Sequence, residues 1–254
     1  MKDIEARHQY IRQQLEEKGM IQVREVANKL GVTGATIRRD LRFLESHHVL
    51  QRGYGNAFPA KGRATDPPLS EKYKVKTYEK SRIAQAALKL LQENDSFMVT
   101  SGSTIEEFTR RMEPLGYHFA VTPSIHLAQI LVKKAGMEVF SLGGRVVKEA
   151  LSVRDASTIE SVRHIRCDKL FFSCDGFDLA AGVTSAYLEE SQLNMAMFSA
   201  CTRRILLADS SKFGKVGPGK TCDLRDLDIL VTDTGLSRTA REQIEALGVK
   251  VILA

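Results

Sequence analysis

The chain has 254 residues, 43% of them hydrophobic, which is enough for one large domain or for a small domain followed by a larger one. This composition excludes wholesale disorder, and no apolar run approaches the roughly 18 residues that a membrane-spanning helix needs. The formal net charge of +6 is unevenly spread, because residues 1–65 hold 12 Lys/Arg against 7 Asp/Glu and the remainder holds 25 against 24. The asymmetry indicates an anionic partner for the N-terminal region.

The N-terminus and the cysteines indicate the cellular compartment. The chain begins MKDIEARHQYIRQQ, which is polar and lacks the apolar segment of a secretion signal. The four cysteines show no CxxC pair and are expected to be reduced thiols rather than a zinc site or a disulfide framework. They are Cys167, Cys174, Cys201 and Cys222. We therefore expect a cytoplasmic protein with no metal site and no cofactor.

Three helical patterns follow one another near the N-terminus. The first has the stripe of an amphipathic helix over residues 4–15, formed by Ile4, His8, Ile11 and Leu15. The second has a shorter stripe formed by Val23, Val26, Ala27 and Leu30. It ends in a turn at Gly31, and Thr33 is the expected N-cap of a third helix with the sequence GATIRRDLRFLES.

The third helix separates an apolar face from a basic one. At 100° per residue, Ile37, Leu41 and Leu44 fall on one side, while Arg39 and Arg42 fall on the opposite side. Two helices joined by a tight turn, the second presenting arginines away from its core, are typical of a helix-turn-helix DNA reader. The arginine fork suits this task because it binds phosphate or guanine through two hydrogen bonds.

A wing is predicted directly after this helix. The segment HHVLQRGYGNAF reads as a strand, a glycine turn and a returning strand, with Arg52 placed to contact phosphate. The alternative for the arginines alone is a solvated helix face, but that alternative explains neither the preceding helix nor the wing. We predict a winged helix-turn-helix over residues 1–57. Its candidate DNA contacts are Thr33, Ala35, Thr36, Arg38, Arg39, Arg42 and Arg52.

The same stretch resembles a known family. ATIRRDLRFLE, preceded by VREVANKLGVT, closely resembles the signature of the DeoR family of sugar-catabolism regulators. The resemblance implies a transcription regulator, usually a repressor that an effector releases. The wing departs slightly, because Gly-Tyr-Gly-Asn-Ala at residues 53–57 stands where the family usually ends in Gly-Gly-Ala. Asparagine tolerates a left-handed backbone, so the turn is expected to survive.

A linker and an α/β domain are predicted for the rest of the chain. Residues 58–80 are rich in Pro, Lys and small residues and are predicted to be the linker. Strand and helix patterns then alternate over residues 81–254, which favours a mostly parallel sheet with helices on both faces. The predicted fold class is therefore α/β, with an N-terminal winged helix-turn-helix.

Polar motifs follow the predicted strands of this domain, at the edge where such sheets bind ligands. The turn Ser101-Gly102-Ser103-Thr104 precedes a helix, and small residues there let backbone N–H groups approach an anion. Gly143-Gly144, Asp175-Gly176-Phe177-Asp178 and Asp209-Ser210-Ser211-Lys212 follow other strands. Each motif alone reads equally as a turn or a cap, whereas their convergence on one edge favours a site for a polyol and a phosphate.

A second resemblance supports that site. SGST, DGFD and ADSSK look like the sugar-phosphate pocket of ribose-5-phosphate isomerase, whose fold the effector domains of the DeoR family share. The likeness implies a phosphate cradle at residues 102–104 and a sugar site that includes Asp175 and Lys212, with Glu189 or Glu190 near the isomerase's carboxylate base. One departure is Thr122-Pro123-Ser124, where the family usually has Thr-Asn-Ser. The candidate effector-binding residues are Ser101, Gly102, Ser103, Thr104, Gly143, Gly144, Asp175, Gly176, Asp178, Thr184, Glu189 and Lys212.

The sequence favours a sensor over an enzyme. Isomerisation needs a carboxylate base and a group that stabilises the enediolate oxygen. The isomerase carries a Lys-Gly-Gly stretch where this chain reads LAAGVTSAYLEE, which contains no lysine. We predict a non-enzymatic repressor of a sugar or polyol catabolic operon, with operator DNA, a phosphorylated sugar or polyol and a second copy of itself (dimer or tetramer) as partners. The alternatives are a sugar-phosphate isomerase and an architectural DNA-binding protein whose C-terminal domain only oligomerises.

Overall fold

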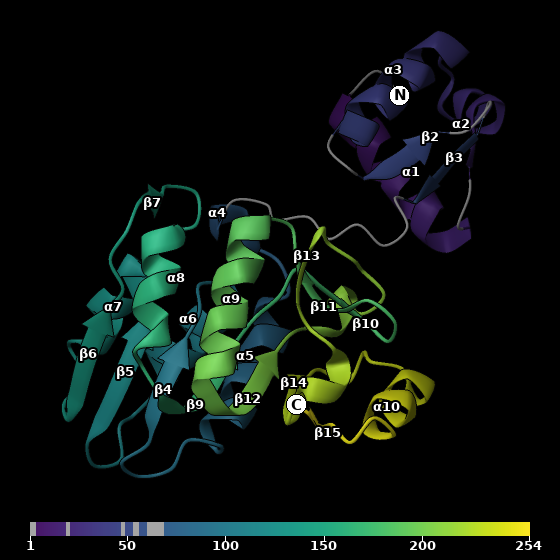
Figure 1. The fold of residues 1–254 in the computed structure, drawn as a ribbon. Helices are drawn as coiled ribbons and strands as arrows, with labels where there is room; N and C mark the ends of the chain where they lie inside the picture. The colour runs from purple at the N-terminus through teal and green to yellow at the C-terminus, as the bar shows by residue number, and fades with distance from the viewer. Residues whose placement is uncertain (1–3, 19–20, 47–48, 53–55, 60–68) are drawn as a thin grey trace. The chain divides into compact units, whose positions relative to one another are not determined.

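A computed structural model describes residues 4–18, 21–46, 49–52, 56–59 and 69–254. The chain forms two compact units, Met1–Arg63 and Ala64–Ala254 (Figure 1). Each unit has its own hydrophobic core. Within the described residues, no helix is both long and apolar enough to cross a membrane.

The N-terminal unit is a three-helix domain with a small antiparallel sheet. Its elements are α1 (Ile4–Lys18), β1 (Ile21–Gln22), α2 (Val23–Leu30), α3 (Gly34–Ser46), β2 (Leu50–Arg52) and β3 (Asn56–Pro59). Strand β3 pairs with both β1 and β2, so Ala57 lies opposite both Ile21 and Arg52. Helix α2 ends at Gly31, whose left-handed φ of 65° makes the tight turn into α3. The predicted winged helix-turn-helix is confirmed; the wing turn at residues 53–55 lies outside the described residues.

The core of this unit matches the predicted faces, with one exception. Ile37, Leu41 and Leu44 of α3 are buried, as are Ile11 and Leu15 of α1. Ile4 was predicted to share the stripe of α1, but it is 60% exposed. That part of the prediction is wrong: Ile4, the first residue of α1, does not join the buried cluster that includes Ile11 and Leu15.

A seven-stranded parallel sheet forms the centre of the C-terminal unit. Its strands are β4 (Ser96–Val99), β5 (His118–Thr122), β6 (Met137–Ser141), β9 (Cys167–Phe172), β12 (Cys201–Leu207), β14 (Ile229–Thr232) and β15 (Lys250–Leu253). The spatial order is β15-β14-β12-β9-β4-β5-β6, and all six neighbouring pairs are parallel. The predicted fold class is confirmed.

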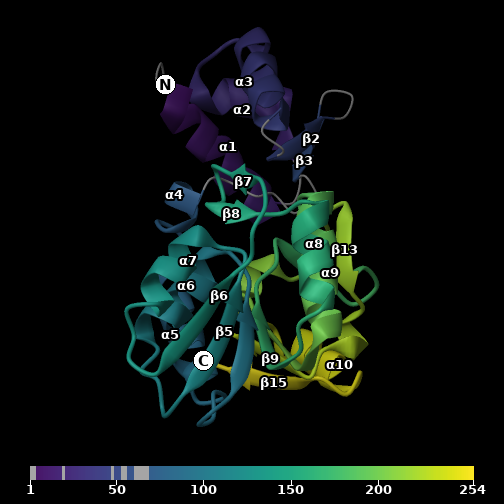
Figure 2. The ribbon, with the colours of Figure 1, turned by 60° about the vertical axis from the view of Figure 1, so that its left-hand side comes forward.

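Helices cover both faces of this sheet (Figure 2). They are α5 (Thr77–Leu88), α6 (Ser103–Arg111) and α7 (Ile125–Leu131) on one face, and α8 (Ala156–Arg163), α9 (Leu188–Ala200) and α10 (Arg238–Glu245) on the other. Successive residues of β9 serve the two cores, because side chains alternate along a strand. Phe171 packs with Phe108 of α6, whereas Phe172 packs with Phe198 of α9.

Smaller elements surround the carboxyl ends of the strands. They are α4 (Leu69–Lys72), the hairpin β7 (Val146–Val147) and β8 (Ser152–Val153), and an antiparallel sheet of β10 (Gly176–Asp178), β11 (Gly182–Ser185) and β13 (Gly219–Cys222). Two 3-10 turns, η1 (Ser210–Lys212) and η2 (Leu224–Asp226), complete the unit.

The predicted linker over residues 58–80 is too long. Strand β3 continues to Pro59, and α4 and the start of α5 occupy much of the C-terminal half of the range. Lys80, only 8% exposed, donates from Nζ to the carbonyl oxygens of Lys72 at 2.5 Å and Val75 at 2.6 Å. The lysine-rich composition was the basis for predicting a linker, but this lysine satisfies backbone carbonyls and fixes the segment to the domain.

The direction of the chain reverses between two adjacent strands. From β4 the chain continues outward to β5 and β6, whereas from β9 it continues the other way to β12, β14 and β15. In open α/β sheets, the loops after two such strands diverge and leave a crevice at their carboxyl ends. The topology therefore places a ligand site between the loops that follow β4 and β9.

Candidate functional site

The exposed face of α3 carries the predicted DNA-contacting residues. Ala35, Arg38, Arg39 and Arg42 are exposed, and Thr36 is partly buried. Thr33 accepts a hydrogen bond from the backbone N–H of Thr36 at 3.2 Å, as an N-cap does, and the two hydroxyls lie 2.9 Å apart. The predicted Arg52 lies at the end of β2, but its side chain is outside the part of the chain that the structure describes.

A buried ion pair lies under that face. Asp40 of α3 and Arg7 of α1 are 4% and 6% exposed. Arg7 donates from Nε and Nη2 to the two carboxylate oxygens of Asp40, at 2.7 and 3.0 Å. This two-pronged contact joins α1 to α3 and fixes the rotation of the helix that presents the arginines.

The loops after β4 and β9 form a small cradle in the crevice. Gly102 is the N-cap of α6 with a φ of 133°, and a Cβ atom there would lie 2.5 Å from Ser173 Oγ. Ser173 in turn donates from Oγ to the carbonyl of Ser101 at 3.1 Å and from its N–H to Thr100 Oγ1 at 3.3 Å. Only glycine fits this position, and the N-terminus of α6 favours a negative charge beside it.

A lysine-rich pocket of about 230 Å³ opens beside the cradle. Its cationic residues are Lys72, Lys76, Lys80, Lys212 and Lys215. Ser103 and Thr104 also line it, and its acidic residues are Glu71 and Asp209. Lys72 and Lys76 also pair with Asp175 and Glu79, which lie outside this lining. Burial lowers the pKa of Lys80, nearby Asp209 opposes this shift, and Lys212 and Lys72 add to it. An anion in this pocket would relieve the repulsion among the lysines.

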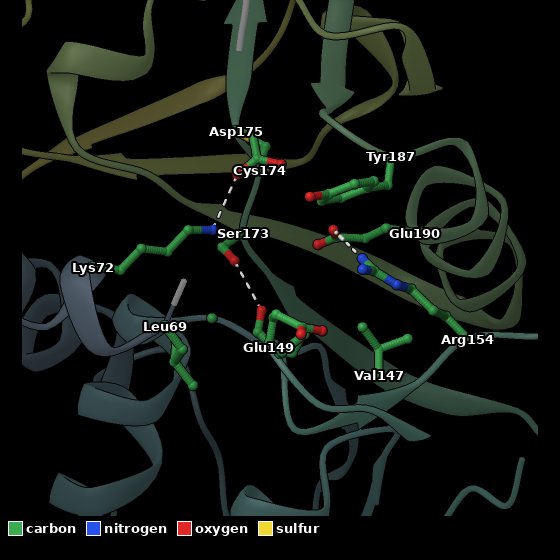
Figure 3. Close-up of a pocket in the computed structure, with 13 residues that line it drawn as sticks. Leu69, Lys72, Val147, Glu149, Arg154, Ser173, Cys174, Asp175, Tyr187 and Glu190 are labelled. Carbon is green, nitrogen blue, oxygen red and sulfur yellow. Dashed lines mark hydrogen bonds and ion pairs between the residues drawn. The ribbon is translucent and has the colours of Figure 1, made fainter. Parts of the chain in front are cut away.

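A second pocket of about 300 Å³ adjoins the first and shares Lys72, Gly102, Ser173 and Cys174 with it. Arg154 donates to Glu190 at 2.9 Å, and its guanidinium lies 4.6 Å from the ring centroid of Tyr187. We call this space the Arg154–Glu190 pocket. Figure 3 shows this group on one side of the space, with Leu69 and Lys72 on the other.

Asp175 joins the two sides of the Arg154–Glu190 pocket. Its carboxylate is 2% exposed, accepts from Lys72 Nζ at 3.2 Å and accepts from the N–H of Ala186 at 2.9 Å. Cys174 beside it lines both pockets, and burial raises the pKa of its thiol, which therefore stays neutral at pH 7. The pocket thus combines charged hydrogen-bonding groups with the flat face of Tyr187.

Half of the twelve predicted effector residues meet at these pockets. They are Ser101, Gly102, Ser103, Thr104, Asp175 and Lys212. They meet because they follow β4, β9 and β12, which are neighbours in the sheet.

The structure places three other predicted residues in structural roles. Asp178 accepts from the N–H groups of Ala180 and Ala181 at 2.8 and 3.1 Å, so it caps the turn between β10 and β11. Gly143 and Gly144 lie after β6 and line neither pocket. The carbonyl of Gly143 accepts from Thr158 Oγ1 at 2.8 Å, and a Cβ at Gly144 would lie 2.3 Å from the same oxygen. The close approach to the N-terminus of α8 accounts for Gly144 and needs no ligand.

Three further predicted residues also lie outside the pocket linings. Thr184 is buried, donates to the carbonyl of Gly176 at 3.1 Å and accepts from Gly217 N–H at 2.9 Å, so its hydroxyl is used within the small sheet. The carbonyl of Lys215 packs against Gly176 so closely that a Cβ would lie 2.2 Å from it. Glu189 is exposed, and its neighbour Glu190 lines the pocket, because successive residues of a helix point about 100° apart.

Several lining residues are absent from the sequence prediction. Lys72, Lys76 and Lys80 lie in the predicted linker, and α4 is too short, at four residues, to show helical periodicity. Arg154 follows the two-residue strand β8, which no alternation pattern marks. The signal that could have found these lysines is the density of positive charge directly before the helix at residue 77.

The two units together define a class of protein. A winged helix-turn-helix with an exposed arginine face, followed by an α/β domain with an anion-favouring crevice, is a DNA-binding transcription regulator with a sensor domain. The chain belongs to the DeoR family: the DeoR-like helix-turn-helix domain matches residues 7–60 and the DeoR C terminal sensor domain matches residues 75–234. Membership confirms the prediction of a DNA-binding regulator rather than an enzyme.

Relatives of known description match over nearly the whole chain. A candidate aga operon transcriptional repressor of Escherichia coli O157:H7 is 30% identical, covering 97% of this chain and 93% of its own length. The lactose phosphotransferase system repressor of Staphylococcus epidermidis is 28% identical, covering 91% of this chain and 92% of its own length. Among solved structures, ribose 5-phosphate isomerase A of Methanocaldococcus jannaschii is similar, with 14% identity and a TM-score of 0.40. The match covers 54% of this chain and 55% of the isomerase chain.

Proposed function

We propose that the protein represses a sugar or polyol catabolic operon and that a phosphorylated sugar or polyol lowers its affinity for operator DNA. The observation that carries this proposal is the pair of adjoining pockets at the carboxyl ends of β4 and β9. One pocket lies beside a helix N-terminus and is lined by five lysines, of which Lys72 and Lys76 pair with Asp175 and Glu79. The other contains paired charged groups and an aromatic face. That combination suits a ligand with a phosphate at one end and hydroxyl groups at the other.

The charges assign an orientation to the ligand. The phosphate would lie in the lysine-rich pocket, with Lys212 as a direct contact, since no described carboxylate lies within ion-pair distance of its ammonium group. The hydroxyl groups would lie in the Arg154–Glu190 pocket. There the cations of Lys72 and Arg154 are accompanied by the carboxylates of Asp175, Glu190 and Glu149. A second phosphate there would meet these carboxylates, so the proposed effector is a monophosphate.

The DNA-binding step would use a symmetric pair of readers. Each chain supplies one α3, and helix-turn-helix proteins read half-sites about one turn of DNA apart. We infer a dimer or tetramer in which the effector changes the spacing of the readers, which requires the effector to bind the two arrangements unequally. The names of the relatives support the role as a repressor and the proposal that the regulated operon concerns a sugar.

The effector prediction is testable by thermal unfolding with phosphorylated sugars and polyols. A monophosphate at 100 times its Kd should stabilise the sensor domain by about 2.7 kcal/mol, which is roughly 5–10 °C for a domain of this size. The matched control is the same sugar without its phosphate, which should produce no shift. If no phosphorylated compound shifted the transition, the architectural alternative would replace this proposal.

The DNA contact is testable with Arg39→Ala. Removing the guanidinium should weaken operator binding by about 1–3 kcal/mol if Arg39 reads a base, because the bidentate contact is lost. Arg238→Ala in α10 is the control, since it removes the same charge from an exposed position in the sensor domain. Fluorescence anisotropy on a DNA fragment that the protein selects from a random pool measures both. Equal affinities for the two variants would exclude Arg39 from the interface.

A further inference from the structure

A short segment of the sensor domain contributes to both pockets. Residues 69–76, which we call the strap, comprise α4 and the turn before α5. Leu69 lines the Arg154–Glu190 pocket, Val75 and Lys76 line the lysine-rich pocket, and Lys72 lines both. Most of the strap lies between the two regions that match the DeoR family, residues 7–60 and 75–234. Lys72 lies outside both matched regions.

Several hydrogen bonds hold the strap to the domain, including one at 3.5 Å from the Leu69 N–H to the carbonyl of Glu149. Lys80 Nζ donates to the carbonyls of Lys72 and Val75, and the hydroxyl of Tyr73 donates to the buried carboxylate of Glu106. Lys76, at the end of the strap, has a φ of 56°, a left-handed conformation that is strained for a lysine. These contacts hold the strap body and leave the Lys72 side chain directed at the crevice, where its Nζ meets Asp175.

The contact between Lys72 and Asp175 lies at the junction of the two pockets. The two atoms are 3.2 Å apart, with the Lys72 side chain 20% exposed and the Asp175 side chain 3% exposed. A phosphate monoester carries about −1.5 to −2 charges at pH 7, against −1 for a carboxylate. At equal distance, a phosphate in the lysine-rich pocket therefore attracts the Lys72 ammonium more strongly than Asp175 does.

We propose that Lys72 binds the phosphate of the effector and that its shift from Asp175 to the phosphate displaces the strap. This inference rests on the proposed function, because it concerns the same ligand. The strap is separated from the N-terminal unit by residues 64–68 alone. In sequence, Lys72 therefore lies nine residues after Arg63, the last residue of the N-terminal unit.

The test compares Lys72→Gln with Lys74→Gln in the full-length protein. Lys74 belongs to the same strap, is exposed and lines neither pocket, so it controls for the loss of a strap charge. The probes are inorganic phosphate and ribose 5-phosphate, and thermal shift across a concentration series gives the affinity. We expect Lys72→Gln to weaken phosphate binding by about tenfold or more, as for a lost charge-assisted hydrogen bond. Lys74→Gln should stay within about twofold of wild type.

A second measurement tests the coupling to the strap. Hydrogen exchange of the Tyr73, Lys74 and Val75 amides, which donate to carbonyls within the strap, should change when phosphate is added to the wild type. The same amides should not respond in Lys72→Gln at a phosphate concentration that saturates that variant. Lys72→Arg, which keeps the charge, should restore part of both the affinity and the response.

The outcomes separate the two proposals. Wild-type protein that binds neither these probes nor any other phosphorylated sugar or polyol would overturn the proposed function and this inference together. Wild-type binding that Lys72→Gln retains within about twofold would overturn this inference alone. Weakened binding in Lys72→Gln with an unchanged response of the strap amides would overturn the displacement and leave Lys72 as a plain ligand contact.

Discussion

Replacing Asp40 by alanine should unfold most of the DNA-binding unit. Arg7 would keep a buried guanidinium without its carboxylate partner, and breaking a buried ion pair from one side costs about 3–5 kcal/mol. At about 0.05–0.15 kcal/mol per residue, the 63 residues of this unit have roughly 3–9 kcal/mol in total. The loss is therefore comparable to the whole stability of the unit, and operator binding should fall with it.

Hydrogen exchange measured separately on α1, α3 and the sensor domain checks this expectation. Protection should be lost in α1 and α3 of Asp40→Ala and kept in α5 and α9, because the two units have separate cores. The control is the double variant Arg7→Met/Asp40→Leu, which removes both charges and should recover most of the protection. If the α3 amides of Asp40→Ala stayed fully protected from hydrogen exchange, the ion pair would not be required for the stability of the DNA-binding unit.

Lys212→Ala should separate effector sensing from DNA binding. The ammonium group lies in the lysine-rich pocket with no described carboxylate paired to it, so its charge is available to an anion. Losing one hydrogen bond to a charged group costs about 1.5–3 kcal/mol, which is a roughly 10- to 150-fold loss of effector affinity. Operator affinity without effector should be unchanged, because Lys212 belongs to the sensor domain.

The measurement is release of operator DNA by increasing phosphorylated sugar. Lys250→Ala on β15 is the control, since it removes an exposed lysine that lines neither pocket. A normal release curve for Lys212→Ala would remove Lys212 from the site. If instead circular dichroism showed an unfolded sensor domain, Lys212 would be reassigned to a structural role.

Periodicity in the sequence was sufficient to predict the DNA reader and the parallel sheet. Ile37, Leu41 and Leu44 face the core and Arg39 and Arg42 face outward, because a helix of 13 residues repeats its pattern over several turns. The strand-end motifs at residues 101–104 and 209–212 also contribute residues to the pockets, because parallel strands bring their carboxyl ends to one edge of the sheet.

The remaining site residues depend on elements too short to carry a pattern. Lys72 is on a four-residue helix, and Arg154 follows a two-residue strand, so neither periodicity nor alternation could mark them. Asp178 and Gly144 have the composition of ligand-binding turns, but their partners are backbone groups and a helix cap within the domain. Sequence composition alone does not distinguish a carboxylate that caps a turn from one that binds a ligand.

The walls of the two pockets come from different parts of the chain. Apart from the four shared residues, the Arg154–Glu190 pocket draws mainly on residues 147–154 and 187–190, whereas the lysine-rich pocket draws on residues 71–80, 103–104 and 207–215. Under the proposed orientation of the effector, exchanging the first two segments for those of another regulator should alter the choice of sugar and leave the contacts to phosphate unchanged. The proposed sugar specificity would then depend mainly on the β7–β8 hairpin and the first turn of α9, separately from the elements that bind the phosphate.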